Sequence, residues 1–171
     1  METHIERIIC PNCGSVQEAT VEHYVPFWSY VHECENCDYV ILESEWRRIK
    51  KLLVFHLKKV WFDKIKSGEK THEFRTVRLW KKQICNYFIS NGMSDSFKCC
   101  VENGRRIAFL LPQLQNDGLI ELCCGYPSRN EKEKWLIAKI KAITINVPGL
   151  ETDLKVDEPV FDIEFELIKG V

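Results

Sequence analysis

Short runs of alternating apolar and polar residues recur along the chain and predict β-strands. Two of them, Thr20–Val25 and Trp28–Val31, lie among turn-forming residues near the N-terminus. The longer runs come later: Leu52–Leu57, Thr71–Val77, Arg105–Leu111, Leu119–Cys123, Trp135–Ile145 and Val160–Ile168. The last run alternates most regularly, because Phe161, Ile163 and Phe165 share one face of the predicted strand.

Three other segments have the spacing of helices. Ser44 is a candidate N-cap for a short helix that continues toward Ile49. Lys59–Lys66 is amphipathic, and Gly68 follows it in the position that ends many helices. Leu79–Phe88 has helical spacing and is followed by an Asn-Gly stop at 91–92. Strands mixed with short helices predict an α+β fold.

The composition is that of a globular protein, with 171 residues of which 45% are hydrophobic and 29% are charged. This length suits one ordinary domain, or a small domain followed by a compact one. The longest apolar runs, such as Leu52–Phe55 and Ile107–Leu111, are too short to cross a membrane. Because the start at Met1–His4 has no signal-peptide pattern, we expect a cytoplasmic protein without membrane contact.

Nine cysteines require an explanation, and the reducing cytosol disfavours disulfides. Four of them form two C-x2-C pairs, Cys10-Pro-Asn-Cys13 and Cys34-Glu-Asn-Cys37, which 20 residues separate. Each pair forms a tight knuckle that directs two thiolates at one point, so two knuckles complete a tetrahedral site. Four thiolates leave no open coordination position. We therefore predict one structural zinc ion bound by Cys10, Cys13, Cys34 and Cys37.

This pattern is typical of a β-rich zinc ribbon, which we place at residues 1–46, with a second domain at residues 47–171. His23 and His32 lie between the knuckles and are interpreted as surface residues of strands. The role of the ribbon stays open among nucleic-acid contact, contact with a protein partner and docking onto the second domain. The remaining thiols are interpreted as small buried hydrophobic groups: Cys85, Cys99, Cys100, Cys123 and Cys124.

The formal net charge of −1 hides a strong asymmetry. The segment from Arg47 to Lys82 holds 13 basic and three acidic residues, a net charge of +10. Aromatic residues such as Phe55 and Trp61 are interleaved with these cations. Cations that bind phosphate and rings that stack on bases are the groups of a nucleic-acid surface. The alternative interpretation is that these charges cover solvated helix faces and never converge.

The same segment contains Gly68-Glu-Lys-Thr-His-Glu-Phe-Arg75, which is G-x-K-x-x-E-x-R. A predicted strand and a short helix precede the motif, and a strand contains its second half. In this context the segment from Leu52 to Val77 resembles the ASCH domain, a member of the PUA-like superfamily. The resemblance implies a small β-barrel with short helices for residues 47–171.

The resemblance also implies a cleft beside the motif, lined by Lys70, Glu73 and Arg75. The two cations would hold a phosphate or a base carbonyl, and Glu73 would accept a hydrogen bond from a base amino group. An alternative role for Glu73 and Arg75 is an internal salt bridge that braces the barrel. The candidate rings for base stacking are Trp61, Phe74 and Trp80.

We therefore expect a nucleic-acid-binding protein that prefers RNA to DNA, or one that recognises a modified nucleobase. One alternative is a hydrolase that uses Lys70 and Glu73, either a ribonuclease or an amidohydrolase of the N4-acetylcytidine type. The amidohydrolase branch has Thr at the position of Glu73 and a later Glu, for which Glu121 is a candidate. His56 and His72 are interpreted as polar strand residues rather than an acid–base pair. A second alternative is a protein-interaction module that uses the ribbon.

Overall fold

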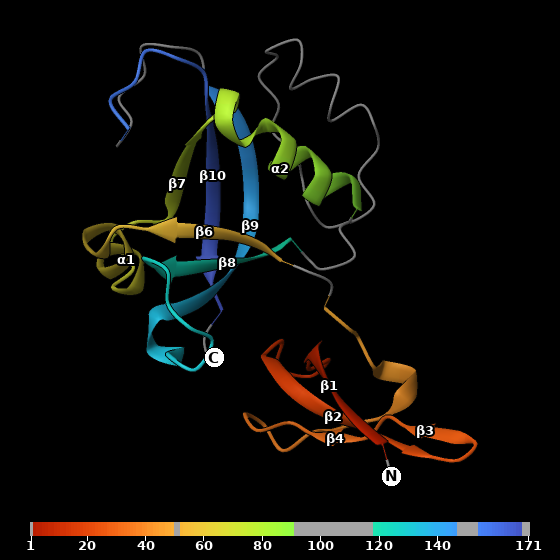
Figure 1. Ribbon diagram of the computed structural model, residues 1–171. Coiled ribbons are helices and arrows are strands. Elements are labelled where there is room, and N and C mark those ends of the chain that lie inside the picture. The colour runs from red at the N-terminus through yellow and green to blue at the C-terminus, as the bar shows by residue number, and fades with distance from the viewer. Residues whose placement is uncertain (1, 50–51, 91–117, 147–153, 169–171) are drawn as a thin grey trace. The chain divides into compact units, whose positions relative to one another are not determined.

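The computed structural model describes residues 2–49, 52–90, 118–146 and 154–168. The chain forms two compact units, of which the first comprises Met1–Lys51 with Ile168–Val171 and the second comprises Leu52–Leu167 (Figure 1). Within the described ranges, the helices are all too short or too polar to span a membrane.

The first unit is built from short strands. Its elements are β1 (Glu2–Ile9), β2 (Val16–Tyr24), β3 (Phe27–Ser29), β4 (His32–Glu33), β5 (Val40–Ile41) and the 3-10 turn η1 (Glu43–Glu45). The first three strands form an antiparallel sheet in the order β1-β2-β3, and β4 pairs with β5. The strand predicted at 20–25 is confirmed as far as Tyr24, within β2, and the strand predicted at 28–31 overlaps β3 only at residues 28–29. Strand β1 was not expected from the sequence.

The predicted helix at Ser44 is wrong. Ser44 lies inside the single turn η1, and Leu42 occupies the N-cap position. The chain leaves this turn because it returns to pair with β1, where Ile49 donates its N–H to the carbonyl of Arg7 at 2.7 Å. This pairing places the end of the first unit near residue 51, a few residues beyond the boundary expected at residue 46.

The second unit mixes strands with two α-helices. Its elements are β6 (Leu53–Leu57), α1 (Lys59–Lys66), β7 (His72–Thr76), α2 (Val77–Ser90), β8 (Leu119–Cys124), η2 (Lys132–Lys134), β9 (Trp135–Asn146) and β10 (Val160–Leu167). These elements confirm most of the predicted strands and both longer helices. The strand predicted at 105–111 and the helix stop at 91–92 lie outside the described residues.

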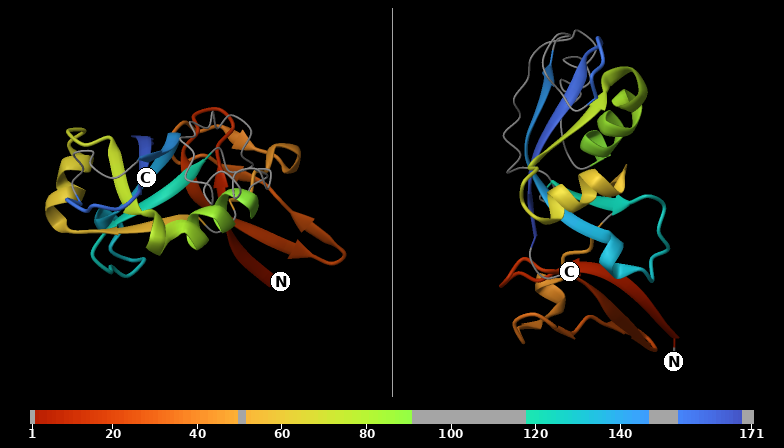
Figure 2. Two further views of the ribbon diagram at one scale, coloured as in Figure 1. Left: turned by 90° about the horizontal axis from the view of Figure 1, so that it is seen from above. Right: turned by 90° about the vertical axis from the view of Figure 1, so that its left-hand side faces the viewer.

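One five-stranded sheet organises the second unit, in the order β6-β8-β9-β10-β7. Strands β6 and β8 are parallel, and the other pairs are antiparallel. The sheet curls, so that β6 and β8 run across the direction of β7 and β10 (Figures 1 and 2). This mixed α+β fold is a half-barrel with two helices, and it is compatible with the predicted small β-barrel.

The core lies on the concave side of this sheet. Phe55, Leu122 and Phe161 are completely buried there. Helix α1 adds Phe62 and Ile65, three residues apart on one helical face, and α2 adds a similar set. The alternation predicted for the last strand is confirmed, because Phe161, Ile163 and Phe165 are buried while Glu166 is exposed.

Candidate functional site

The four cysteines of the two C-x2-C pairs converge in the first unit. All four sulfur atoms lie within 4.8 Å of one another. The Sγ atoms of Cys10 and Cys37 are 3.7 Å apart, and those of Cys13 and Cys34 are also 3.7 Å apart. Metal bonds of about 2.3 Å in a tetrahedral site separate the sulfurs by about 3.8 Å. The cluster therefore has the size of a four-thiolate metal site.

Both knuckles have the same backbone geometry. The residue after the second cysteine of each pair is left-handed, with φ values of 73° at Gly14 and 57° at Asp38. Its N–H donates to the carbonyl of the first cysteine, at 2.9 Å in each knuckle. The first knuckle joins β1 to β2, and the second joins β4 to β5, so two hairpins position the four ligands.

Polar groups surround the sulfur atoms and shift the pKa values of their thiols. The hydroxyl of Ser15, itself buried, lies 3.1 Å from the sulfur of Cys13 and 3.5 Å from that of Cys34. Burial raises the pKa of the Cys10 thiol to about 12. Burial also opposes ionisation of Cys34, but hydrogen bonds from Ser15 and from the Asn36 backbone outweigh it and lower its pKa to about 5. A bound cation would stabilise all four thiolates.

The hydrophobic core around these sulfurs is small. Ile8, Ala19 and Ile41 pack with Cys10 and Cys34, and the partly buried Tyr39 and Trp46 pack against this cluster. A core of this size supplies little stability. A bound ion would therefore suit this unit both because it adds folding free energy and because the sulfur geometry matches it.

In the second unit, the motif places Lys70 against two aromatic rings. Its Nζ lies 5.3 Å from the ring centre of Trp61 on α1 and 5.0 Å from that of Phe74 on β7. Gly68, with φ of +83°, turns the chain after α1, and the N–H of Lys70 then donates to the carbonyl of Lys64 at 3.0 Å. Lys70 and both rings are partly exposed.

Arg75 and Glu73 form an ion pair on the other face of β7. Nη1 of Arg75 lies 2.6 Å from Oε1 of Glu73, and the two side chains are 14% and 6% exposed. The guanidinium also packs on the rings of Phe55 and Trp80, at 5.2 and 5.0 Å from their centres. Burial lowers the pKa of Arg75, and the neighbouring charge of Glu73 opposes this shift.

Arg75 additionally joins the two edges of the curled sheet. Its Nη2 donates to the carbonyl of His56 on β6, at 3.1 Å. Strands β6 and β7 are the first and last in the sheet order, so this single side chain links them. This geometry matches the alternative interpretation from the sequence, in which Glu73 and Arg75 form an internal salt bridge that braces the barrel. The remaining donor, Nε, is buried without a partner among the described residues.

The six predicted site residues therefore fall into two groups. Successive residues of β7 point to opposite faces of the sheet, so Phe74, which contacts Lys70, lies on one face. Glu73 and Arg75 lie on the other face. Their register partners there, Ile163 and Phe161, are buried in the core. Trp61 belongs with the Lys70 group, and Trp80 belongs with the Arg75 group. The Lys70 group is partly exposed, whereas the Arg75 group is mainly buried.

Glu121, the candidate acid for hydrolysis, lies on the convex face of the sheet. It alternates on β8 with Ile120 and Leu122, which are core residues. Both of its oxygens accept hydrogen bonds from Arg129, at 2.6 and 3.0 Å. Glu73 points to the concave side, so the two carboxylates lie on opposite faces of the sheet.

Tyr126, an exposed aromatic residue beside this convex face, was not predicted as a site residue from the sequence. Tyr126 is 89% exposed and stacks on the ring of His56, with the ring centres 4.4 Å apart. Nδ1 of His56 lies 2.8 Å from the carbonyl of Gly125 and 3.1 Å from the sulfur of Cys123. Burial raises the pKa of the Cys123 thiol to about 11, so it behaves as the buried structural group that we expected. A tyrosine followed by proline in a short loop was the signal available.

The two candidate histidines are not brought together. His72 on β7 pairs with Asp162 on β10, whose oxygen lies 2.7 Å from its Nδ1. His56 instead contacts the loop after β8. Several cations of the basic segment also pair inside the unit: Lys59 with Asp63, Lys64 with Glu69, and Arg78 with Glu158. These pairs reduce the net charge that the segment presents.

Comparisons with protein-family models, with curated proteins and with solved structures give no match. The resemblance to the ASCH domain thus stays a prediction that the eight-residue motif and its strand–helix–strand context support. The structure adds the arrangement of these residues: a cluster of four cysteine sulfurs, a lysine cation beside two rings, and an arginine that braces the sheet.

Proposed function

We propose that the protein binds nucleic acid, with RNA or a modified nucleobase preferred, through the Lys70 region of an ASCH-like second unit. One observation carries this proposal: the ammonium group of Lys70 lies between the partly exposed rings of Trp61 and Phe74. A cation beside aromatic faces contacts a phosphate while the rings stack on unpaired bases. Unpaired bases are more common in RNA, which favours RNA over duplex DNA.

Other exposed groups of the second unit are candidates for further contacts with the nucleic acid. Lys66 at the end of α1 and Lys58 before its start are both exposed. The exposed ring of Tyr126 adds a position where a base can stack. Arg75 is assigned to the scaffold in this proposal, because it braces the sheet edges.

The geometry favours binding over hydrolysis. Glu73 is committed to its ion pair with Arg75, and Glu121 is committed to Arg129 on the opposite face of the sheet. An amidohydrolase or ribonuclease that combined Lys70 with these carboxylates would need them close together. The arrangement of the described residues does not bring them together.

We further propose that the cluster in the first unit holds one structural zinc ion. Four thiolates in tetrahedral geometry suit zinc, and they also suit iron. Elemental analysis of the purified protein tests the identity of the metal. We expect one zinc per chain, lost when Cys13 and Cys34 are both replaced by serine. One iron per chain, with the absorption bands of an iron–thiolate centre, would contradict the zinc assignment.

The nucleic-acid proposal is tested with a labelled single-stranded RNA of about 12 nucleotides, a length that spans one typical binding site. Fluorescence anisotropy compares the metal-loaded wild type with Lys70→Ala. We expect the variant to bind more weakly and to lose about 0.7 from the slope of log affinity against log salt, the value for one phosphate contact on a single strand. Denaturing gels run on the same samples report cleavage.

Lys155→Ala is the matched control, because it removes the same charge from an exposed position. Lys155 precedes β10, whose first residue pairs with Thr76, whereas Lys70 precedes the opposite end of β7. The control should bind like the wild type. Equal binding by both variants would remove Lys70 from the interface, and shortened RNA that depends on Lys70 would favour the ribonuclease alternative.

A further inference from the structure

The three-stranded sheet of the first unit packs only one of its faces onto the core of that unit. On β2, Ala19 belongs to this core and Val21 on the same face is also buried, whereas Thr20 between them is exposed. Strand alternation places Glu18, Glu22 and Tyr24 with Thr20 on the second face. This second face is at least partly exposed from Glu18 to Tyr24, whereas Val16 and its register partner Ile9 at the other end are buried.

Large apolar side chains are exposed on this second face. Ile5 is 66% exposed, Tyr24 is 53% exposed, Phe27 is 73% exposed and Val31 is 54% exposed. Ile5 pairs in register with Thr20, and Phe27 pairs with Tyr24, so these side chains share the face. Single exposed apolar residues are common, but several on one face mark an interaction surface. We call these four residues the apolar patch.

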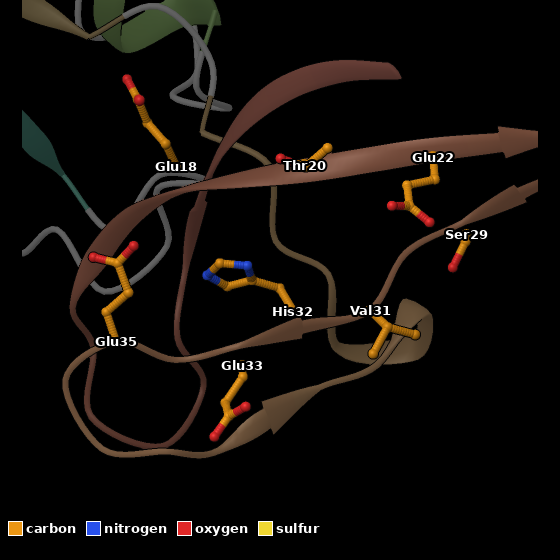
Figure 3. Close-up of a pocket in the computed structure, with 8 residues that line it drawn as sticks. All are labelled: Glu18, Thr20, Glu22, Ser29, Val31, His32, Glu33 and Glu35. Carbon is orange, nitrogen blue, oxygen red and sulfur yellow. The ribbon is translucent and has the colours of Figure 1, made fainter. Parts of the chain in front are cut away.

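An acidic groove of about 430 Å³ adjoins the apolar patch. Val31 lines the groove, and so do four carboxylates, Glu18, Glu22, Glu33 and Glu35. Figure 3 shows these carboxylates around the ring of His32. Arg7 pairs in register with Glu18 and is a cation on the same face. The groove therefore combines a negative potential with an apolar border.

The charge of the whole first unit points in the same direction. The sequence of this unit, Met1–Lys51 with Ile168–Val171, contains six basic and nine acidic side chains, a net charge of −3. A divalent metal bound by four thiolates adds a further −2. Such a surface repels phosphate groups and attracts cations. Nucleic acid is therefore a poor occupant for this face, and a basic polypeptide is a good one.

We propose that this face binds a segment of a partner protein in which Lys or Arg residues accompany apolar side chains. The cations occupy the acidic groove between Glu22 and Glu33, and the apolar side chains cover Tyr24 and Phe27. Aromatic residues supply contact area, and the complementary charges fix register and speed association. This surface belongs to the first unit and the Lys70 region belongs to the second, so this proposal does not depend on the RNA proposal.

Selection from a phage-displayed library of random peptides, about 12 residues long to match common interface segments, tests the proposal. The target is the full-length, metal-loaded protein. We expect enriched peptides with net positive charge and aromatic or aliphatic residues, whose binding weakens as salt increases. Enrichment of acidic or neutral peptides, or no enrichment, would overturn the proposal.

Two matched pairs of variants then locate the binding of an enriched peptide. Phe27→Ser should weaken binding by about tenfold, whereas Leu42→Ser, at a position that is 50% exposed and does not line the groove, should have little effect. Glu18→Gln/Glu22→Gln should also weaken binding, whereas Glu2→Gln/Glu43→Gln removes the same charge without effect. Metal content confirms that each variant is folded. The proposal would be overturned if, within either pair, the control variant lost as much peptide affinity as the test variant. Loss of RNA binding in Phe27→Ser would also overturn it.

Discussion

Replacement of Arg75 by alanine should destabilise the second unit, because Arg75 holds together the two edges of its sheet. The side chain donates to the carbonyl of His56 on β6 and pairs with Glu73 on β7. Removing one partner of a buried ion pair costs about 3–5 kcal/mol, since the other charge stays buried without a partner. Arg75 is 14% exposed, so we expect a value near the lower end, about 3 kcal/mol.

Urea unfolding of the metal-loaded chain measures this loss through far-ultraviolet circular dichroism. With a slope of about 2 kcal/mol per molar urea, the midpoint should fall by about 1.5 M. Arg75→Lys keeps the charge but loses the planar fork, so it should fall between the wild type and Arg75→Ala. The double variant Glu73→Ala/Arg75→Ala should recover part of the stability, because no carboxylate is left buried alone.

The brace assignment fails if Arg75→Ala unfolds at the wild-type midpoint while its affinity for RNA is lost. Arg75 would then contact the ligand rather than hold the sheet. Nε, which has no hydrogen-bond partner within the described part of the chain, would be the donor for that contact.

Three further predictions concern the metal, the exposed ring and the turn after α1. Removal of the metal by a chelator should unfold β1–β5 and leave the second unit folded, and amide NMR spectra that lost signals from both units would contradict this. Tyr126→Ala should weaken RNA binding by about 1–3 kcal/mol, the value of one stacked base, without changing the salt slope. Tyr126→Phe should bind like the wild type, and equal affinities for both variants would remove this ring from the interface. Gly68→Ala should lower the free energy of unfolding by about 1–2 kcal/mol, because φ is +83° there, a conformation that strains alanine. A steric clash does not contribute, since no described atom beyond the adjacent residues lies within 4 Å of the added Cβ. An unchanged thermal midpoint would contradict the predicted backbone strain.

The sequence was sufficient where the determinants are local. The two C-x2-C pairs each form their own knuckle, so their spacing alone predicted the four-cysteine cluster that the structure shows. Helix α1 and strand β7 were predicted for the same reason, since Gly68 and the apolar spacing act within a few residues. Strand β1 was missed because its residues are mostly polar. Glu6 within it is buried only because His4, Trp46 and Arg48 provide polar contacts, and two of these lie about forty residues away.

The candidate site depends more on contacts that are distant in sequence. The motif predicted that Lys70, Glu73 and Arg75 matter, but only the fold shows that Arg75 reaches His56 on the opposite edge of the sheet. The pairing of Glu121 with Arg129 follows from a loop conformation that no local pattern specifies. The stacking of Tyr126 on His56 joins positions 70 residues apart, so no local pattern specifies this contact. These contacts arise from tertiary packing.

The most direct test of the central proposal is the affinity of the metal-loaded wild type for a labelled single-stranded RNA between about 50 and 200 mM salt. The account predicts saturable binding that weakens with salt, with a log–log slope of about −1.4 or steeper, which corresponds to two or more phosphate contacts. Saturable binding without salt dependence, or no binding at the lowest salt, would contradict the nucleic-acid function proposed for the Lys70 region.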